Sequence, residues 1–303
     1  MSTGNKDGKP ALSIVIATTK PWPEMRGCLE SLETQAAATG AEILVMDGDG
    51  QGLPEQQHTP AKIRWIRKPG ASVFQLRAMG MSEARADIVA VTEDHCRVAP
   101  DWCQRVLDAH QRHPEAAAIG GVVENGATGS TLDWAQFLVA NGPFMRPIKS
   151  GVADCIALQA NVSYKRHALP GAFSNAGIME MLYNQELHQR GELLLADDSL
   201  LVYHVQSLGF RGSCAINFHN GRSIAGYRLQ IMRLPERWLR LLGCFILPPV
   251  MLFRSYIMLA EKKRPIGFAL SVTPYLITLL VCHAAGEFVG YITGAGESPK
   301  HLR

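Results

Sequence analysis

The sequence has little that would suggest an oxidising compartment or a nucleic-acid partner. Its seven cysteines are scattered and none forms a Cys-x-x-Cys pair, which disfavours a disulfide framework and a zinc site and fits a reducing compartment. The formal net charge is only +3, too small to indicate nucleic-acid binding. Residues 1–10 are polar and lack an apolar stretch, so we expect a disordered leader there and not a secretory signal.

The basic residues are concentrated in the C-terminal third of the chain. Between 221 and 265 only two residues, Glu236 and Glu261, are acidic. The basic residues of the same stretch are Arg222, Arg228, Arg233, Arg237, Arg240, Arg254, Lys262, Lys263 and Arg264. Such clustering indicates a membrane surface or a phosphate-rich ligand. With 303 residues, of which 47% are apolar, the chain is long enough for one large domain or two.

Short apolar runs alternate with segments of helical spacing. Strand patterns occupy 12–18, 41–46, 62–66, 88–92 and 117–123, and helical patterns occupy 25–34, 72–83 and 101–111. This order predicts an α/β fold, with a parallel sheet and helices on both of its faces. The sequence further predicts a strand over 155–164, a helix over 178–189, and two late strands at 193–195 and 200–204. The stretch 125–151 has no readable pattern.

The most informative stretch is the strand pattern of 88–91, which leads directly to Glu93, Asp94 and His95. In open α/β sheets, ligands bind beyond the carboxyl ends of the strands, where these three side chains would lie. All three can ligate a hard or borderline cation that in turn holds a phosphorylated ligand. The alternative is an acidic turn that caps the helix beginning near Pro100, and these residues alone favour neither interpretation.

Two apolar segments follow Trp238. The first, 241–253, contains two prolines and is too short to span a bilayer alone, so we expect a re-entrant or interfacial helix. The second, 266–285, is long enough to cross, and the basic residues between the two segments favour a cytoplasmic loop. The alternatives are a topology in which both segments cross and the basic residues lie on the far side, and a soluble helical hairpin. The expected division of the chain is a leader (1–10), a main domain (11–235), membrane-associated helices (236–296) and a tail (297–303).

Taken in order, the segments between Leu12 and Arg228 resemble family 2 glycosyltransferases, which have the GT-A fold. In that family a carboxylate at the position of Asp47 holds the nucleotide base, and an Asp-x-Asp motif holds a divalent cation. Glu93 and His95 stand in place of the two aspartates, which leaves open both the metal, Mn²⁺ or Mg²⁺, and whether Glu93 or Asp94 binds it. The resemblance implies that the nucleotide is bound by Thr18, Asp47, Arg77 and Asp94.

The resemblance also implies a base and a further metal ligand. The catalytic base of such enzymes lies about eleven residues before a glycine. Here Glu180 lies eleven residues before Gly191 and is the implied base. A histidine after the late strand completes the metal site, so that the full implied set is Glu93, Asp94, His95 and His204.

Three further residues lie in segments that resemble the acceptor and diphosphate regions of the family. Asn161 belongs to an acceptor-side pattern, with a plain edge strand and turn as the alternative. Arg222 and Arg228 belong to a basic motif that would clamp the diphosphate, or alternatively bind lipid head groups.

The function that the resemblance implies is inverting transfer of a sugar from a nucleotide-sugar donor, with a UDP-sugar favoured. The acceptor would be lipid-linked or a polysaccharide precursor, at the cytoplasmic face of the inner (plasma) membrane. One alternative is a nucleotidylyltransferase, which would need a Gly-rich basic loop that 18–22 does not provide. The other is a catalytically inactive membrane scaffold. The sugar, the acceptor and the formation of a homo-oligomer stay open.

Overall fold

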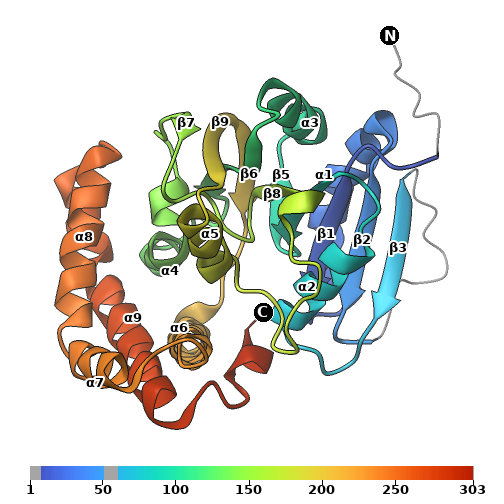
Figure 1. Ribbon diagram of the computed structural model, residues 1–303. Helices are drawn as coiled ribbons and strands as arrows, with labels where there is room; N and C mark the ends of the chain where they lie inside the picture. The colour runs from blue at the N-terminus through green and yellow to red at the C-terminus, as the bar shows by residue number, and fades with distance from the viewer. Residues whose placement is uncertain (1–7, 51–60, 303) are drawn as a thin grey trace. The chain divides into compact units, whose positions relative to one another are not determined.

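The computed structural model describes residues 8–50 and 61–302, and the chain divides into two compact units (Figure 1). Unit 1 consists of the chain up to Glu124 together with Arg146–Val205. Unit 2 consists of Asn125–Met145 and the chain from Gln206 onward. Most of the expected leader, 1–10, lies outside the described residues.

Unit 1 contains a nine-stranded sheet in the order β3-β2-β1-β4-β8-β6-β9-β5, with β7 paired to β9. Its strands are β1 (Ser13–Thr18), β2 (Glu42–Asp47), β3 (Lys62–Arg67), β4 (Ile88–Glu93), β5 (Cys96–Val98), β6 (Ala116–Asn125), β7 (Gly151–Val152), β8 (Val162–Lys165) and β9 (Leu193–His204). Strands β1 to β4 are parallel. Strand β8 is antiparallel to β4 and β6, and β9 is antiparallel to β5 and β7. The expected α/β class with a mostly parallel sheet flanked by helices is confirmed. The antiparallel direction of β8 and β9 could not be predicted, because hydrophobic periodicity identifies strands without fixing the direction in which they pair.

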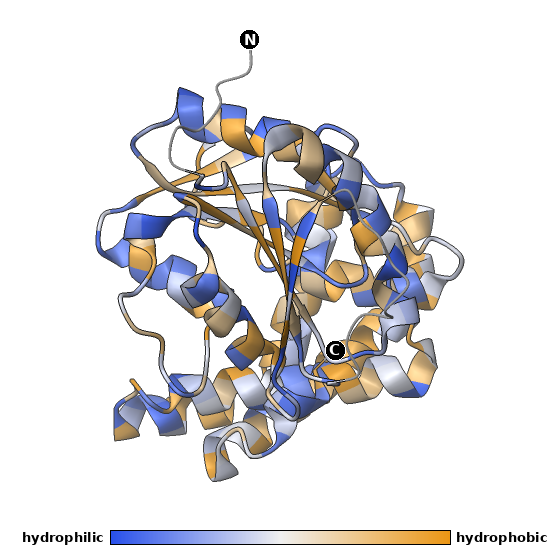
Figure 2. Ribbon diagram, turned by 90° about the vertical axis from the view of Figure 1, so that its right-hand side faces the viewer, coloured by the Kyte–Doolittle hydropathy of each residue, from blue (hydrophilic) through white to orange (hydrophobic). Residues whose placement is uncertain are grey.

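The α-helices of unit 1 in its described residues are α1 (Trp22–Thr39), α2 (Val73–Glu83), α3 (Trp102–Arg112) and α5 (Glu180–Gln189), and a 3₁₀ turn, η2, spans Arg166–Ala168. Helix α1 ends at Gly40, whose φ of 69° suits glycine. Helix α2 begins at Ser72, which forms a capping box with Gln75. The strands at the centre of Figure 2 carry long orange, hydrophobic stretches, in agreement with the complete burial of the β2 residues.

The strand register brings three expected site residues to one edge of the sheet. Thr18 at the end of β1 pairs with Asp47 at the end of β2. On the other side of β1, Ala17 pairs with Glu93 at the end of β4. Parallel strands that end together therefore provide the common ligand-facing edge that the sequence predicted.

Two details of the late strands differ from expectation. Only Val162–Lys165 of the predicted strand 155–164 is a strand. The two late strands are one continuous strand, β9, although Asp197 and Asp198 lie in its middle. Asp197 is tolerated there because its carboxylate accepts hydrogen bonds from Ser199 and Arg112.

Unit 2 is helical. Its elements are α4 (Thr131–Asn141), the 3₁₀ turn η1 (Gly142–Phe144), α6 (Gly209–Arg228), α7 (Leu234–Gly243), α8 (Leu247–Glu261), α9 (Ile266–Thr293) and η3 (Ser298–His301). Among the described residues, α9 is the one helix that is by itself long and apolar enough to cross a membrane. Helices α7 and α8 pass the same test only together, as a pair bent by 70°. The unpatterned stretch 125–151 thus contains α4, which is capped by the Ser130 side chain.

The boundary between the units differs from the expected boundary at 235. Helix α6 was expected in the main domain but belongs to unit 2, because its glycines allow it to pack closely against α9. A Cβ added at Gly286 of α9 would lie 2.0 Å from the carbonyl oxygen of Phe218 in α6. The expected tail is also ordered: Ser298 is buried, and His301 stacks on His219 with ring centroids 4.4 Å apart.

Candidate active site

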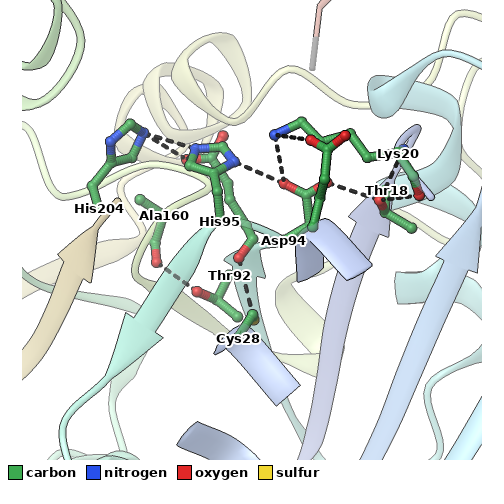
Figure 3. A network of polar contacts seen from close by, with 10 residues as sticks. Thr18, Lys20, Cys28, Thr92, Asp94, His95, Ala160 and His204 are labelled. Atoms are coloured by element: carbon green, nitrogen blue, oxygen red, sulfur yellow. Dashed lines mark hydrogen bonds and ion pairs between the residues drawn. The ribbon is translucent and has the colours of Figure 1, made fainter. Parts of the chain in front are cut away.

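Glu93, His95 and His204 meet at the carboxyl end of β4, and we call them the ligand trio. Figure 3 shows the rings of His95 and His204 side by side. They meet because β5 pairs with β9 in a register that sets Cys96 opposite His204, while the backbone N–H of Val205 donates to the carbonyl of His95. The two Nε2 atoms are 2.9 Å apart. Oε2 of Glu93 lies 3.7 Å from Nε2 of His95 and 3.6 Å from Nε2 of His204.

The donor atoms of the ligand trio fit a single divalent cation. Ligands bonded at about 2.1 Å to one ion are themselves roughly 3 to 3.5 Å apart, close to the separations observed. Oε2 of Glu93 is buried and has no hydrogen-bond partner, so it lacks the compensation that a buried carboxylate needs. Burial lowers the pKa of His204 well below its ordinary value, which keeps the ring neutral and able to ligate. Sγ of Cys96 also lies within 4.8 Å of the donor atoms of Glu93 and His95, but burial raises the pKa of this thiol well above its ordinary value.

Asp94 faces away from the ligand trio and supports it. Its Oδ2 accepts a hydrogen bond from Oγ1 of Thr18 at 2.8 Å, and its Oδ1 lies 2.7 Å from Nδ1 of His95 (Figure 3). Burial alone would raise the pKa of Asp94, but the contact with His95, the charge of Lys20 and the Thr18 hydroxyl lower it. An ionised carboxylate can only accept, so Nδ1 of His95 donates to Asp94, and in the neutral ring this places the lone pair on Nε2, toward the trio.

Glu180 begins helix α5 and is completely enclosed. Nε of Arg77 lies 3.1 Å from its Oε1, and both side chains are buried. The preceding segment lies directly on helix α2: the N–H of Ile178 donates to the carbonyl of Phe74, and a Cβ at Gly177 would lie 2.2 Å from the Phe74 backbone. Arg77 lies one turn beyond Phe74, so this close approach brings the arginine to the glutamate.

The protonation of Glu180 is perturbed by these surroundings. Burial raises the pKa of its carboxyl, the Arg77 guanidinium opposes the rise, and the charge of Glu93 adds to it. The charge of Glu93 thus acts on the carboxyl of the expected base. Carboxyls with raised pKa values are typical of groups that exchange protons at active sites.

Asp47 lies at the carboxyl end of β2 and is almost completely buried. Its Oδ2 accepts from Nε1 of Trp65 at 2.9 Å, and its Oδ1 accepts from the backbone N–H of Gly50 at 2.7 Å. The ring of Trp22 meets that of Trp65 edge-on, with centroids 6.1 Å apart. A carboxylate oxygen can accept more than one hydrogen bond, so these two bonds do not exclude a contact with a nucleotide base. That contact stays a prediction.

Lys20 and Trp65 belong to the site although no sequence motif marks them. Nζ of Lys20 lies 3.8 Å from Oδ1 of Asp94, and Trp65 fixes the orientation of Asp47. The only signal available for Lys20 was its position two residues after Thr18. Trp65 was indistinguishable from any aromatic residue in an alternating strand.

Asn161 has different contacts from those expected of an acceptor-binding residue. Its amide nitrogen donates to the carbonyls of Val122 and Leu200, and its oxygen accepts from Nε1 of Trp102 at 2.9 Å. Both amide hydrogens are therefore engaged in the protein interior, where they fix the packing of β6, β9 and α3.

Arg222 and Arg228 belong to unit 2 and interact there with α9. Nε of Arg222 donates to the carbonyl of Gly294, and its Nη2 donates to Oγ1 of Thr293. Nη1 of Arg228 lies 3.4 Å from both carboxylate oxygens of Glu287. A role for the two arginines in diphosphate binding stays a prediction.

Comparison with known proteins agrees with this geometry. The model of Glycosyl transferase family 2 matches residues 13–169, more than half of the chain. The chain is 26% identical over 128 residues to EpsH of Bacillus subtilis (strain 168), which is named as a glycosyltransferase. It is 23% identical over 118 residues to the glucosyl-dolichyl phosphate glucuronosyltransferase of Haloferax volcanii. These matches cover 41% and 37% of this chain, and 37% and 38% of the two relatives.

A solved structure covers more of the chain than either relative. The mannosyltransferase PcManGT from Pyrobaculum calidifontis, in complex with GDP-Man and Mn²⁺, matches 92% of this chain and 87% of its own, with a TM-score of 0.54 and 14% identity. At this identity the likeness shows the fold alone, and it confirms the GT-A fold. Together with the family match over more than half of the sequence, it shows that the chain belongs to glycosyl transferase family 2.

Proposed function

We propose that this protein transfers a sugar from a nucleotide-sugar donor to an acceptor hydroxyl in a single inverting displacement. The observation that carries the proposal is the ligand trio at the strand ends, together with the buried Glu180, on whose carboxyl the charge of Glu93 acts. A scaffold without activity would have no need for an uncompensated buried carboxylate oxygen on Glu93 beside two imidazole rings.

Glu93, His95 and His204 would hold the cation, with Asp94 orienting His95. A bound divalent cation would neutralise the negative charge that builds on the diphosphate leaving group. Two imidazoles and one carboxylate suit Mn²⁺ better than Mg²⁺, which prefers oxygen ligands. The Pyrobaculum mannosyltransferase, which contains Mn²⁺, supports the same preference.

Glu180 is the proposed catalytic base. In its ionised form the carboxylate accepts the proton of the acceptor hydroxyl as the oxygen attacks the anomeric carbon, and the bond to the diphosphate breaks. Burial raises the pKa of Glu180, and the Arg77 guanidinium opposes this rise by favouring the ionised form of the carboxyl. One displacement inverts the anomeric configuration, and no covalent sugar–enzyme intermediate forms.

The proposed donor is a UDP-sugar, because Asp47 can accept the imide N–H of uracil beside Thr18. We propose a lipid-linked or polysaccharide-precursor acceptor at the cytoplasmic face of the plasma membrane, with Arg222 and Arg228 near its phosphates or the donor diphosphate. The name of the Haloferax relative, which includes a glucosyl-dolichyl phosphate, supports a lipid-linked acceptor. The basic, apolar helices of unit 2 support a location at the membrane.

The test measures the release of UDP from a panel of UDP-sugars by the full-length protein with Mn²⁺. A second series measures how the rate of UDP release changes when a lipid-linked acceptor is added. We expect hydrolysis or transfer with Mn²⁺ and much less with Mg²⁺. Calorimetry with UDP and Mn²⁺ distinguishes the transferase from the inactive scaffold, because the scaffold is expected to bind neither. Pyrophosphate release from a nucleoside triphosphate and a sugar phosphate would identify a nucleotidylyltransferase and overturn the proposal.

A further inference from the structure

Exposed apolar side chains are concentrated in unit 2. Of the eighteen large apolar side chains that are exposed in the described part of the chain, sixteen belong to unit 2 and only Val152 and Tyr203 belong to unit 1. Scattered exposed apolar residues are normal, but a concentration on a few adjacent helices indicates a surface that meets another apolar phase.

On each of three helices the exposed apolar residues follow one face. They are Leu234, Trp238, Leu239 and Leu242 on α7, Val250, Phe253 and Ile257 on α8, and Ile266, Leu270, Ile277, Val281 and Ile292 on α9. Spacings of three, four, seven and eleven residues keep each set on one side of its helix. Helix α9 thus has an exposed apolar stripe along its whole length.

The opposite face of α9 is covered by protein. Figure 1 shows α9 between α8 and α6. The ring of Phe210 in α6 lies 6.3 Å from that of Tyr275, and a Cβ at Gly290 would lie 2.6 Å from the carbonyl oxygen of Arg222. Helix α6 therefore accompanies α9 from Tyr275 to Gly290, at a distance that leaves no room for lipid between them.

This packing is difficult to reconcile with a membrane-spanning α9. Any segment of α9 that entered the hydrocarbon would carry the adjacent part of α6 with it. Helix α6 contains Arg211, His219, Asn220, Arg222 and Arg228. Charged and strongly polar side chains are costly at the centre of a bilayer.

The turn between α8 and α9 is also held in place. Nζ of Lys262 donates to the carbonyls of Pro143 at 2.9 Å and Met145 at 2.6 Å. Met145 directly precedes Arg146, where the chain returns to unit 1. The guanidinium of Arg264 lies over the Trp134 ring, 5.2 Å from its centroid. The turn that precedes α9 is thus bonded to Pro143 and Met145, the last residues of unit 2 before the chain returns to unit 1.

The charges around the exposed stripes favour one kind of surface. Between α7 and the start of α9 the chain carries Arg233, Arg237, Arg240, Arg254, Lys262, Lys263 and Arg264 against two glutamates. Arginine and lysine beside a stripe of leucine, isoleucine and tryptophan are typical of helices that lie in the interface of an anionic membrane.

We propose that unit 2 is a monotopic membrane unit. Its exposed stripes on α7, α8 and α9 enter the boundary between head groups and acyl chains of one anionic leaflet, and α9 lies along the membrane without crossing it. The proposal replaces the spanning α9 expected from hydropathy with an in-plane helix. It does not depend on sugar transfer, so it and the proposed activity can fail separately.

Three positions of the α9 stripe provide the test. Leu270, Val281 and Ile292 are eleven residues apart, so the outer two are separated by about 33 Å along the helix, close to the thickness of a bilayer core. Each is changed singly to Trp in a full-length Trp238→Phe parent, in vesicles of phosphatidylcholine and phosphatidylglycerol. Quenching by lipids brominated at shallow or deep acyl positions then reports the depth of each tryptophan relative to the parent.

An in-plane helix gives three similar, shallow depths, and the native Trp238 is quenched by the shallow bromines as well. A spanning helix gives a maximum depth at position 281 and shallow values at 270 and 292, which would overturn the proposal. Absence of quenching at all three positions would also overturn it, in favour of a soluble helical hairpin.

Vesicle binding provides the second test, with a matched control in unit 1. The double variant Leu239→Glu, Leu242→Glu is expected to weaken co-sedimentation with phosphatidylglycerol-containing vesicles by at least about tenfold, because both side chains are exposed and would meet acyl chains. Val152→Glu changes an equally exposed apolar residue and is expected to leave binding unchanged. Melting curves verify that each variant folds. Equal loss in both variants, or equal binding of the native chain to pure phosphatidylcholine at low salt, contradicts an anionic membrane surface at α7.

Discussion

Each unit contains an arginine–glutamate pair with a buried carboxylate, and the two pairs differ in how fully that carboxylate is compensated. In unit 1, Glu180 has Arg77 on one side, and burial still raises the pKa of its carboxyl. In unit 2, Glu287 has Arg228 at 3.4 Å and Nε2 of His283 at 3.3 Å. A carboxylate compensated from two sides stabilises the packing of α6 against α9. One that is compensated from a single side retains an affinity for protons, as a general base requires.

Replacing the two glutamates is expected to show the largest difference between the pairs. Glu180→Gln removes the proton acceptor, so turnover should fall by about 10² to 10⁴, equivalent to roughly 3 to 5 kcal/mol in the barrier. Glu287→Gln removes a structural contact and should lower the melting temperature with little change in turnover. UDP release with Mn²⁺ and thermal melting measure the two effects.

The buried Arg77 would be left unpaired in Glu180→Gln, and an unpaired buried charge is destabilising. Glu180→Asp keeps the charge but withdraws the carboxylate, so it should fold and yet lose most of the turnover. Full activity in a folded Glu180→Gln protein would remove Glu180 as the base.

Asp94→Asn is expected to have the next largest effect, on metal affinity. The amide no longer holds the proton on Nδ1 of His95 by a charged contact, so Nε2 becomes a poorer ligand. Loss of such a supporting carboxylate costs about 10 to 100-fold in affinity. Calorimetric titration of Mn²⁺ in the presence of UDP measures this affinity. Asp108→Asn on the outer face of α3 is the control, and an equal change there would exclude a specific effect at position 94.

The sequence predicted the parallel half of the sheet well because each of its strands is a short apolar run bounded by polar residues. On that basis Glu93 could be placed at a strand end, whereas Thr18 and Asp47 became candidate site residues through the resemblance to the family. The different contacts of Glu93 and Asp94 could not be predicted. They depend on the β5–β9 register, which brings His204 to Glu93, while Asp94 accepts a hydrogen bond from Thr18.

Long-range packing set the other limits of prediction. Asn161 matched an acceptor-side pattern, but its amide is used by Val122, Leu200 and Trp102, none of which is near it in sequence. The hydropathy of α9 predicted a membrane span. A mean hydropathy does not reveal that one face of the helix is covered by α6. Windowed hydropathy sums over both faces of a helix, whereas burial distinguishes them.

Substitution of Gly286 tests whether unit 2 depends on close helix packing. A Cβ there would lie 2.0 Å from the carbonyl oxygen of Phe218, a backbone atom that cannot easily move. Overpacking of this kind costs about 1 to 3 kcal/mol, so Gly286→Ala should lower the denaturation midpoint of unit 2. Gly267→Ala in the same helix has open space around it and should be neutral or gain up to about 1 kcal/mol. Equal stability of the two variants would contradict the contact.

The smallest expected effect is a pH shift in Arg77→Gln, and it distinguishes two roles of the arginine. Without the guanidinium, the neutral form of the Glu180 carboxyl is favoured and its pKa rises further. Because the base must be ionised, the acidic limb of kcat/KM moves to higher pH, so that activity lost near neutral pH returns under alkaline conditions. If instead Arg77 contacts the nucleotide phosphates, KM for the donor rises at every pH and the profile keeps its shape. A pH series of UDP release, with the surface variant Arg105→Gln as control, separates a shifted limb from a uniform loss and so decides whether the arginine acts on the glutamate or on the donor.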